Sequence, residues 1–373
     1  MSVVFVLGAG ASYGESLESL DSPYQVPAGL TALHSAGAPP PLIKGFFQKA
    51  LYSALKYDPS DAEADYKPVF DYARDSMCIT DPFGEGRWNE VDLEDLFTSV
   101  EIHREFSAPE SVESGLLGVK RNLLARYIQR ILGLCTSGKF GQYSKLLVSK
   151  LTMEHSVITF NYDLLLDQQF YELSPGGNGE FAHYENFESI VLQGETKGLP
   201  GPSGAEGLYL KLHGSLNWSQ CTNRACPRKS VVIMDREVQR VLNHRMGIGE
   251  MRCEVCNGEL APLLIPPLLD KPIAEIPAIR AAWGLAQRRL SQASTVVLIG
   301  YSAPPTDFYS KWLLRSNVGT RKDVNVFVVD PDNEKAPFKT RMMNLFPYGY
   351  KSKFTKMDQV GGILESVGLN DRR

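Results

Sequence analysis

Long apolar runs, an excess of basic residues and a dense cysteine framework are all missing from this sequence of 373 residues. No stretch approaches the roughly 18 consecutive apolar residues of a membrane helix, and prolines interrupt the most apolar segment, 260–269. A formal net charge of -4 argues against a protein that binds nucleic acid through a basic surface. Residues 1–8 carry no basic start of a signal peptide and suit a strand. We therefore expect a cytoplasmic protein without a membrane segment or direct nucleic-acid contact.

The composition is that of a folded protein with a sizeable core, because 43% of the residues are hydrophobic and only 22% are charged. The length is compatible with two or three structural units or with one large domain that carries insertions. Six cysteines in a chain of this kind are expected to be reduced thiols. Clustered cysteines are therefore metal candidates before they are disulfide candidates.

Four short runs of β-branched and aromatic residues each end in a glycine or a polar turn, and they occupy residues 3–7, 156–160, 295–299 and 324–329. Continuous apolar runs of this length are typical of parallel strands that are buried on both faces. The sequence therefore predicts an open α/β sheet of the Rossmann-like kind, with a ligand site at the carboxyl ends of its strands.

A long segment between the first two strands has helical spacing instead. Leu93, Leu96 and Phe97 share one helical face after Asp92, and apolar residues recur every three or four positions over 119–132. We expect a helical insertion over 39–150 within a Rossmann-like domain made of 1–38, 151–218 and 262–373. Cys78 and Cys135 of the insertion are expected in its core.

The first strand runs into the turn Gly8-Ala9-Gly10-Ala11-Ser12. Glycines let a phosphate approach the backbone, and the amino end of the following helix offers N–H donors. The alternative is a tight strand-to-helix turn without a ligand. The third glycine of the dehydrogenase fingerprint is missing, so the turn alone predicts only a weak phosphate site.

Two more polar groups follow predicted strands. Asn161 and Asp163 come after the run that ends at Phe160, and His213 precedes Gly214 after another apolar run. A carboxamide, a carboxylate and an imidazole at strand ends suit a catalytic site. Asn161 as a turn residue and Asp163 as a helix N-cap are the structural alternatives. Of the six histidines, only His213 sits at a strand end beside a glycine, which favours it as the acid/base group.

Four cysteines occur as two closely spaced pairs within residues 219–261: Cys221 with Cys226, and Cys253 with Cys256. This spacing is typical of a tetrahedral zinc site, in which four thiolates close the coordination shell. We expect a small zinc-binding module whose Zn²⁺ is structural, because a closed shell leaves no position for water. Buried thiols without a metal are the alternative.

Together, the glycine turn, the Asn-x-Asp segment, the His-Gly pair and the four-cysteine module resemble the sirtuin family, in this order along the chain. The resemblance implies a site for NAD. It implies NAD contacts at Gly8, Ala9, Gly10 and Ser12, at Asp163, at the turn Gly300, Tyr301 and Ser302, and at Asp330 beside the adenine ribose. It implies catalytic roles for Asn161 and His213.

The chain departs from sirtuin deacylases at two places. Residues 22–27 contain no arginine after the glycine turn, and residues 264–268 replace the segment that binds the acyl-lysine peptide in that family. Short segments such as 89–94 and 300–307 resemble the sequences of the bacterial sirtuin-like branch. Members of that branch degrade NAD in antiphage defence, often beside a partner ATPase or an Argonaute-type protein.

The sequence therefore favours hydrolysis of NAD to nicotinamide and ADP-ribose. Deacylation of protein lysines, with NAD as co-substrate, and non-catalytic sensing of NAD or ADP-ribose remain open, because a fold does not fix an activity. In the favoured reading Asn161 orients ribose hydroxyls or water, Asp163 holds the nicotinamide carboxamide and His213 is the general base. The amphipathic surface of the insertion is expected either to cap the site or to mediate a homo-oligomer or partner contact.

Overall fold

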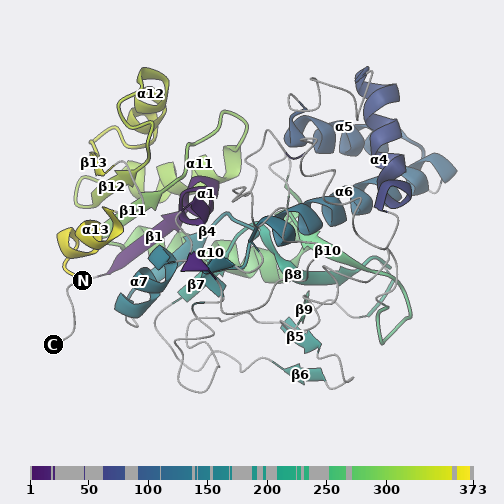
Figure 1. The fold of residues 1–373 in the computed structure, drawn as a ribbon, viewed down its shortest axis with the longest axis horizontal. Coiled ribbons are helices and arrows are strands. Elements are labelled where there is room, and N and C mark those ends of the chain that lie inside the picture. The colour runs from purple at the N-terminus through teal and green to yellow at the C-terminus, as the bar shows by residue number, and fades with distance from the viewer. Residues whose placement is uncertain are drawn as a thin grey trace.

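The computed structural model describes a large part of the chain (Figure 1). The described residues are 2–17, 20–21, 46, 62–79, 91–109, 111–136, 139–140, 142–151, 154–167, 169, 187–190, 196–198, 208–223, 225–227, 231–234, 252–265, 271–354 and 359–369. Within them the molecule has three parts: a parallel sheet with helices on both faces, a second sheet, and a group of helices.

The parallel sheet has the strand order β13-β12-β11-β1-β4-β7, and every neighbouring pair in it is parallel. Its strands are β1 (Val3–Leu7), β4 (Ser156–Thr159), β7 (Leu208–Lys211), β11 (Thr295–Ile299), β12 (Asn325–Val329) and β13 (Lys351–Phe354). The chain winds from β1 toward β7 on one side and from β11 toward β13 on the other. The predicted Rossmann-like sheet is therefore confirmed, with its change of winding direction between β1 and β11.

Alternate residues of β1 belong to two different cores. Val4 and Val6 join the core that packs against α10 (Pro277–Gln292), α11 (Phe308–Leu314) and α12 (Ala336–Leu345). Phe5 and Leu7 join the core that packs against α7 (Gln142–Lys150) and α13 (Val360–Ser366), with α1 (Ala9–Leu17) on the same side. Burial on both faces explains why the strand is apolar throughout.

The second sheet begins one turn after the first ends. Its order is β10-β8-β9-β5-β6, with β8 (Gly214–Cys221), β9 (Val231–Met234), β10 (Leu260–Leu264), β5 (Phe187–Ile190) and β6 (Thr196–Gly198). Gly214 joins β7 to β8 with φ +85, and a Cβ there would overlap the Leu263 carbonyl. Glycine is required at this position, and its turn fixes the place of His213 between the two sheets. A short pair, β2 (Leu20–Asp21) and β3 (Lys139–Phe140), and the helical turn η3 (Pro272–Glu275) complete the connections.

The helices α4 (Ala62–Met77), α5 (Leu93–Phe106) and α6 (Val112–Thr136) confirm the predicted helical segment. In Figure 1, α4 and α5 lie at the end of the molecule opposite to β12 and β13, and α6 extends back toward β8 and β10. Leu93, Leu96 and Phe97 are buried as expected, and the Asp92 side chain caps α5 by accepting from the Glu94 N–H. Leu216 and Leu264 of the second sheet belong to the same core, so these helices are anchored on that sheet.

The domain boundaries predicted above remain a prediction, but two packing facts bear on them. Helix α7, inside the predicted insertion range, packs on α1 and α13 of the parallel sheet. The cysteine module is continuous with the second sheet, because β8 leads into Cys221.

The expectation that Cys78 is a core residue is wrong. It is exposed and stands at φ 55, directly after α4 has ended at Met77. The side chain of Cys135 lies outside the described residues. Among the helices that the structure describes, none has the length and apolarity to cross a membrane.

Candidate functional site at the strand ends

The glycine turn after β1 lies directly against the turn after β11. Gly8 donates its N–H to the Ile299 carbonyl (3.0 Å) and Gly10 donates to the Gly300 carbonyl (2.9 Å). A Cβ on Gly8 would lie 2.5 Å from the Gly300 oxygen, and Gly300 itself has φ +61. The two predicted phosphate turns therefore meet where the sheet reverses its winding. Their close approach requires glycine whether or not a ligand binds.

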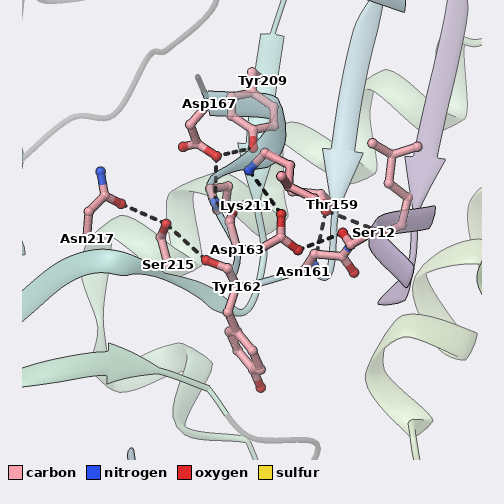
Figure 2. Close-up of polar contacts among 12 residues, drawn as sticks. Ser12, Thr159, Asn161, Tyr162, Asp163, Asp167, Tyr209, Lys211, Ser215 and Asn217 are labelled. Carbon is pink, nitrogen blue, oxygen red and sulfur yellow. Dashed lines mark hydrogen bonds and ion pairs between the residues drawn. The ribbon is translucent and has the colours of Figure 1, made fainter. Parts of the chain in front are cut away.

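Asn161 and Ser12 form one hydrogen-bonded network with Asp163 (Figure 2). The Asn161 Nδ2 donates to the Gly8 carbonyl (2.9 Å) and to Ser12 Oγ (2.8 Å), and Ser12 Oγ donates to Asp163 Oδ2 (2.6 Å). Because both Nδ2 hydrogens are engaged, Asn161 offers its Oδ1 to a ligand, and this atom is an acceptor. The ring of Tyr162 points the opposite way in Figure 2, as expected for the residue between two that share a direction.

Asp163 also has a structural role. Its Oδ1 accepts from the Leu165 N–H (3.1 Å), which is the N-cap alternative weighed above. Burial raises the pKa of its carboxyl, and the ammonium of Lys211 opposes that shift. Lys211 is buried as well and donates to the Asp163 carbonyl (2.6 Å) and to Asp167 (2.8 Å). The Asp163 carboxylate thus fixes the position of the Ser12 hydroxyl, which donates to it.

A small cavity with both polar and apolar lining residues lies beside this network, between the sheet and the helices α1 and α7. It has a volume of about 30 Å³ and is lined by Ser12, Glu15, Ser144, Asn161 and Asp163 among others. That volume is enough for an ordered water. Burial raises the pKa of Glu15, whose carboxylate accepts from the N–H and the hydroxyl of Ser144 at the start of α7.

His213 is buried at the end of β7, on the α10 side of the sheet. Its ring lies 5.1 Å from the Phe160 ring and is stacked on Trp283 at 6.2 Å, measured between centroids. Burial and the neighbouring ammonium of Lys271 lower the pKa of His213 to about 3. The imidazole is therefore neutral at physiological pH, as a general base must be before it accepts a proton.

Asn161 and His213 follow neighbouring strands, since the Leu212 N–H donates to the Thr159 carbonyl (3.0 Å). Their described contacts belong to separate networks. Asn161 is bonded to Ser12, whereas the Nε2 of His213 lies 2.9 Å from the Nζ of Lys271. The structure places both groups at one edge of the sheet and brings neither into contact with the other.

A buried charged cluster that the sequence reasoning missed surrounds His213. Lys271 donates to Asp307 Oδ1 (2.7 Å), and Tyr301 donates its hydroxyl to Asp307 Oδ2 (3.1 Å). Glu94, at the start of α5, accepts from the Thr306 hydroxyl (2.8 Å). Burial raises the pKa of Glu94 to about 6. Asp307 lies in the segment 300–307 and Glu94 in the segment 89–94, both of which resemble the bacterial sirtuin-like branch. No sequence pattern pointed to Lys271.

The remaining predicted contacts lie at the strand ends in different settings. Tyr301 is buried against Phe160, with ring centroids 5.0 Å apart, so its side chain belongs to the charged cluster. Ser302 is exposed, and its carbonyl accepts from Arg341 (2.9 Å). Asp330 directly follows β12, and its Oδ1 accepts from the Asp332 N–H (2.9 Å); burial raises the pKa of its carboxyl.

The four predicted metal ligands converge. The sulfur atoms of Cys221, Cys226, Cys253 and Cys256 all lie within 4.8 Å of one another. The pairs 221–256 and 226–253 are 3.4 and 3.8 Å apart, close to the roughly 3.8 Å between thiolates at tetrahedral Zn–S distances. Although burial opposes it, N–H groups of Cys256 and Val255 lower the pKa of Cys253 to about 6. The cluster therefore fits a structural Zn²⁺.

No protein-family model and no curated protein matches the sequence. Among solved structures, a Sir2 homologue–NAD complex is 12% identical, with a TM-score of 0.43 and 99% of this chain and 90% of that chain covered. Sir2 bound to acetylated peptide is 13% identical, with a TM-score of 0.41 and coverage of 99% and 94%. Sir2 with the inhibitor EX-527, 2'-O-acetyl-ADP-ribose and deacetylated p53 peptide is 12% identical, with a TM-score of 0.41 and coverage of 99% and 95%. Likeness at this level carries no argument about ligand or activity, and the fold class rests on the strand order given above.

Proposed function

We propose that the chain is a sirtuin-like hydrolase that cleaves NAD to nicotinamide and ADP-ribose. The observation that carries the proposal is the network of Ser12, Asn161 and Asp163, which lies beside the glycine turn where the sheet changes its winding direction. Dinucleotides bind at this place in open α/β sheets. The identity of the substrate, NAD, is inferred from the order of the sequence motifs, which resembles that of sirtuins.

The adenosine diphosphate half of NAD is assigned to the β1, β11 and β12 ends. The amino end of α1 is a place for the diphosphate, because helix N-termini attract anions; of its N–H groups, that of Gly10 is already bonded to the Gly300 carbonyl. Ser302 is exposed at the turn after β11, on the phosphate side. Asp330 at the end of β12 is an acceptor suited to the adenine ribose hydroxyls.

The nicotinamide half is assigned to the β4 and β7 ends. Nicotinamide in NAD is already cationic, so its glycosidic bond breaks without a proton donor, and the site must stabilise a ribosyl cation. The Oδ1 of Asn161 is an acceptor for a ribose hydroxyl or for the attacking water. Asp163 is assigned to the nicotinamide carboxamide. His213 is assigned as the base that removes a proton from the hydroxyl or the water.

The biological setting is a proposal from the resemblance alone. The branch that the sequence resembles degrades NAD during bacterial antiphage defence. We assign this chain to the same setting, in the cytoplasm, as a homo-oligomer or beside a partner ATPase or Argonaute-type protein. Sedimentation analysis at several concentrations tests the homo-oligomer, and a monomer throughout would remove it.

Incubation of the purified chain with NAD alone tests the activity. Release of nicotinamide and ADP-ribose without peptide is the expected result. Release that requires an acyl-lysine peptide would instead assign the chain to the deacylases. Binding of NAD without release would assign it to the sensors. Asn161→Ala and His213→Ala are each expected to abolish release while the fold persists.

A further inference from the structure

The buried surroundings of His213 contain a cation in direct contact with the ring nitrogen that a base would use. Nζ of Lys271 lies 2.9 Å from His213 Nε2 and 2.7 Å from Asp307 Oδ1. The side chains of Lys271 and Asp307 are only 0% and 4% exposed. Because water does not reach this buried ammonium, its contacts with His213 and Asp307 must compensate for the lost hydration.

The chemistry of this contact sets the tautomer of the imidazole. An ammonium carries three donors and no acceptor, so Nε2 of His213 must be the acceptor. The proton of the neutral ring then sits on Nδ1.

Among the described residues, the charged and titratable groups that face this pair lie on separate segments of the fold. Lys271 precedes η3, Asp307 precedes α11, and Glu94 belongs to α5 of the helical insertion. Tyr301 and Tyr162 are buried phenols whose pKa values are raised by burial, so both stay neutral. Burial of Asp307 opposes its ionisation, but the ammonium of Lys271 lowers the pKa of its carboxyl to about 2, so the ion pair persists at acidic pH.

We propose that Lys271, anchored by Asp307, is a positioning residue that holds His213 neutral, with its proton on Nδ1 and its Nε2 presented as an acceptor. The state of the ring follows from the contacts alone. Its use in catalysis rests on the proposed function: a hydroxyl or water that gives its proton to His213 must replace the Lys271 ammonium at Nε2. Lys271 thereby keeps the Nε2 of His213 free of a proton, and it contacts this atom until substrate binds.

Nitrogen NMR of the full chain labelled with ¹⁵N-histidine tests the resting state without any turnover. His213→Gln assigns the signal, because the chain has only six histidines. The expected spectrum shows a proton on Nδ1 and no titration of His213 between pH 8 and pH 5. A ring that carries its proton on Nε2, or that titrates near its ordinary value of about 6.5, would overturn the proposal.

Lys271→Met removes the cation and leaves Asp307 facing the ring. Burial still opposes protonation of the ring in this variant, but the cation is gone and Asp307 favours the charged ring. The pKa of His213 is therefore expected to rise above its wild-type value in Lys271→Met and to stay low in Lys271→Arg. Lys211→Met is the matched control, because Lys211 is an equally buried lysine paired with Asp167 on the other side of the sheet. An unchanged His213 signal in folded Lys271→Met would refute the proposal. If that variant does not fold, the wild-type spectrum still decides.

Activity supplies a second readout. In Lys271→Met the kcat/KM for nicotinamide release is expected to fall about tenfold for each pH unit below the new pKa of His213, whereas the wild-type profile lacks this limb. Identical profiles in the two proteins would overturn the positioning role. If the wild type releases no nicotinamide at all, the proposed function fails, and the NMR result still decides the state of the ring.

Discussion

Three charged side chains that are buried in the described part of the chain have partners on other segments. Lys211 of β7 is paired with Asp167 after β4, and Lys271 is paired with Asp307 at the start of α11. Glu15 of α1 accepts from the N–H of Ser144 in α7. An unpaired buried charge costs several kcal/mol, so each of these pairs also fixes the position of one element against another.

Glu94 is expected to make stability depend on pH in a defined window. Burial raises the pKa of its carboxyl from 4.5 to about 6, so the folded state holds a proton there that the unfolded state has lost. The contribution to stability is complete below pH 4.5 and is lost as the pH rises through about 6. The free energy of unfolding should fall by roughly 2 kcal/mol on this account.

Glu94→Gln isolates this effect, because glutamine still accepts from the Thr306 hydroxyl and does not ionise. Urea unfolding at pH 4.5 and pH 7 should show the variant gaining roughly 2 kcal/mol over the wild type at the higher pH. An equal difference between the two proteins at both pH values would mean that the carboxylate is not perturbed.

The sequence revealed some site residues and concealed others for a physical reason. Asn161 and His213 follow apolar strand runs, and the carboxyl ends of parallel strands share an edge, so their neighbourhood was predictable. Lys271 lies between prolines with no periodic signal, and its partners are 58 and 36 residues away in sequence. Such contacts form only when the fold brings distant segments together, so no local sequence pattern predicts them.

At the scale of elements, the crossing of the two glycine turns is one of the tight backbone contacts among the described residues. The loop after β11 passes over the start of α1 with backbone against backbone, and Gly300 has φ +61. A side chain at this crossing would separate β11 from the amino end of α1. The diphosphate position proposed above depends on that separation staying short.

Gly300→Ala is therefore expected to destabilise the protein by more than about 3 kcal/mol, since a positive φ and a steric overlap add together. Gly349→Ala is the matched control: it has φ +102 but no heavy atom within 4 Å of the added Cβ, so only backbone strain of about 1 kcal/mol is expected. Thermal or urea unfolding measures both. Equal losses would show that the crossing is not tightly packed.

Elements with strong patterns were predictable, and polar edge elements were not. The central strands β1 and β11 are uniform apolar runs and stood out in the sequence. Strand β13 reads Lys351-Ser352-Lys353-Phe354 and lies at the sheet edge, where polar residues are tolerated. The second sheet was also missed, because its strands β5 and β6 are short and lie in a segment rich in glycine and proline.

At the scale of the whole molecule, the helical group is joined both to the cysteine module and to the loop before α11. Arg126 of α6 donates to Glu259 (2.9 Å) and to the Leu260 carbonyl (2.7 Å), directly after the second pair of cysteines. Glu94 of α5 reaches the loop before α11. A change in these helices therefore has a physical route to the surroundings of His213.

The cysteine module should hold one zinc ion per chain, measured by elemental analysis of the purified protein. Cys253→Ser should lose the metal and lower the melting temperature, because the ion joins β8 to the loop before β10. Cys78→Ser is the control, since Cys78 is exposed and distant in sequence. Full zinc content in Cys253→Ser would exclude this cluster as the site.

The central claim is that the glycosidic bond of NAD breaks beside Asn161, at the edge where β1 and β4 end. The most direct measurement is nicotinamide release from NAD alone by the wild type, by Asn161→Ala and by Asn217→Ala. Asn217 is a control asparagine on β8, bonded to Ser215 (2.7 Å). We predict release by the wild type and the control, and a loss of at least about 100-fold in Asn161→Ala. Equal release by all three proteins would contradict the account.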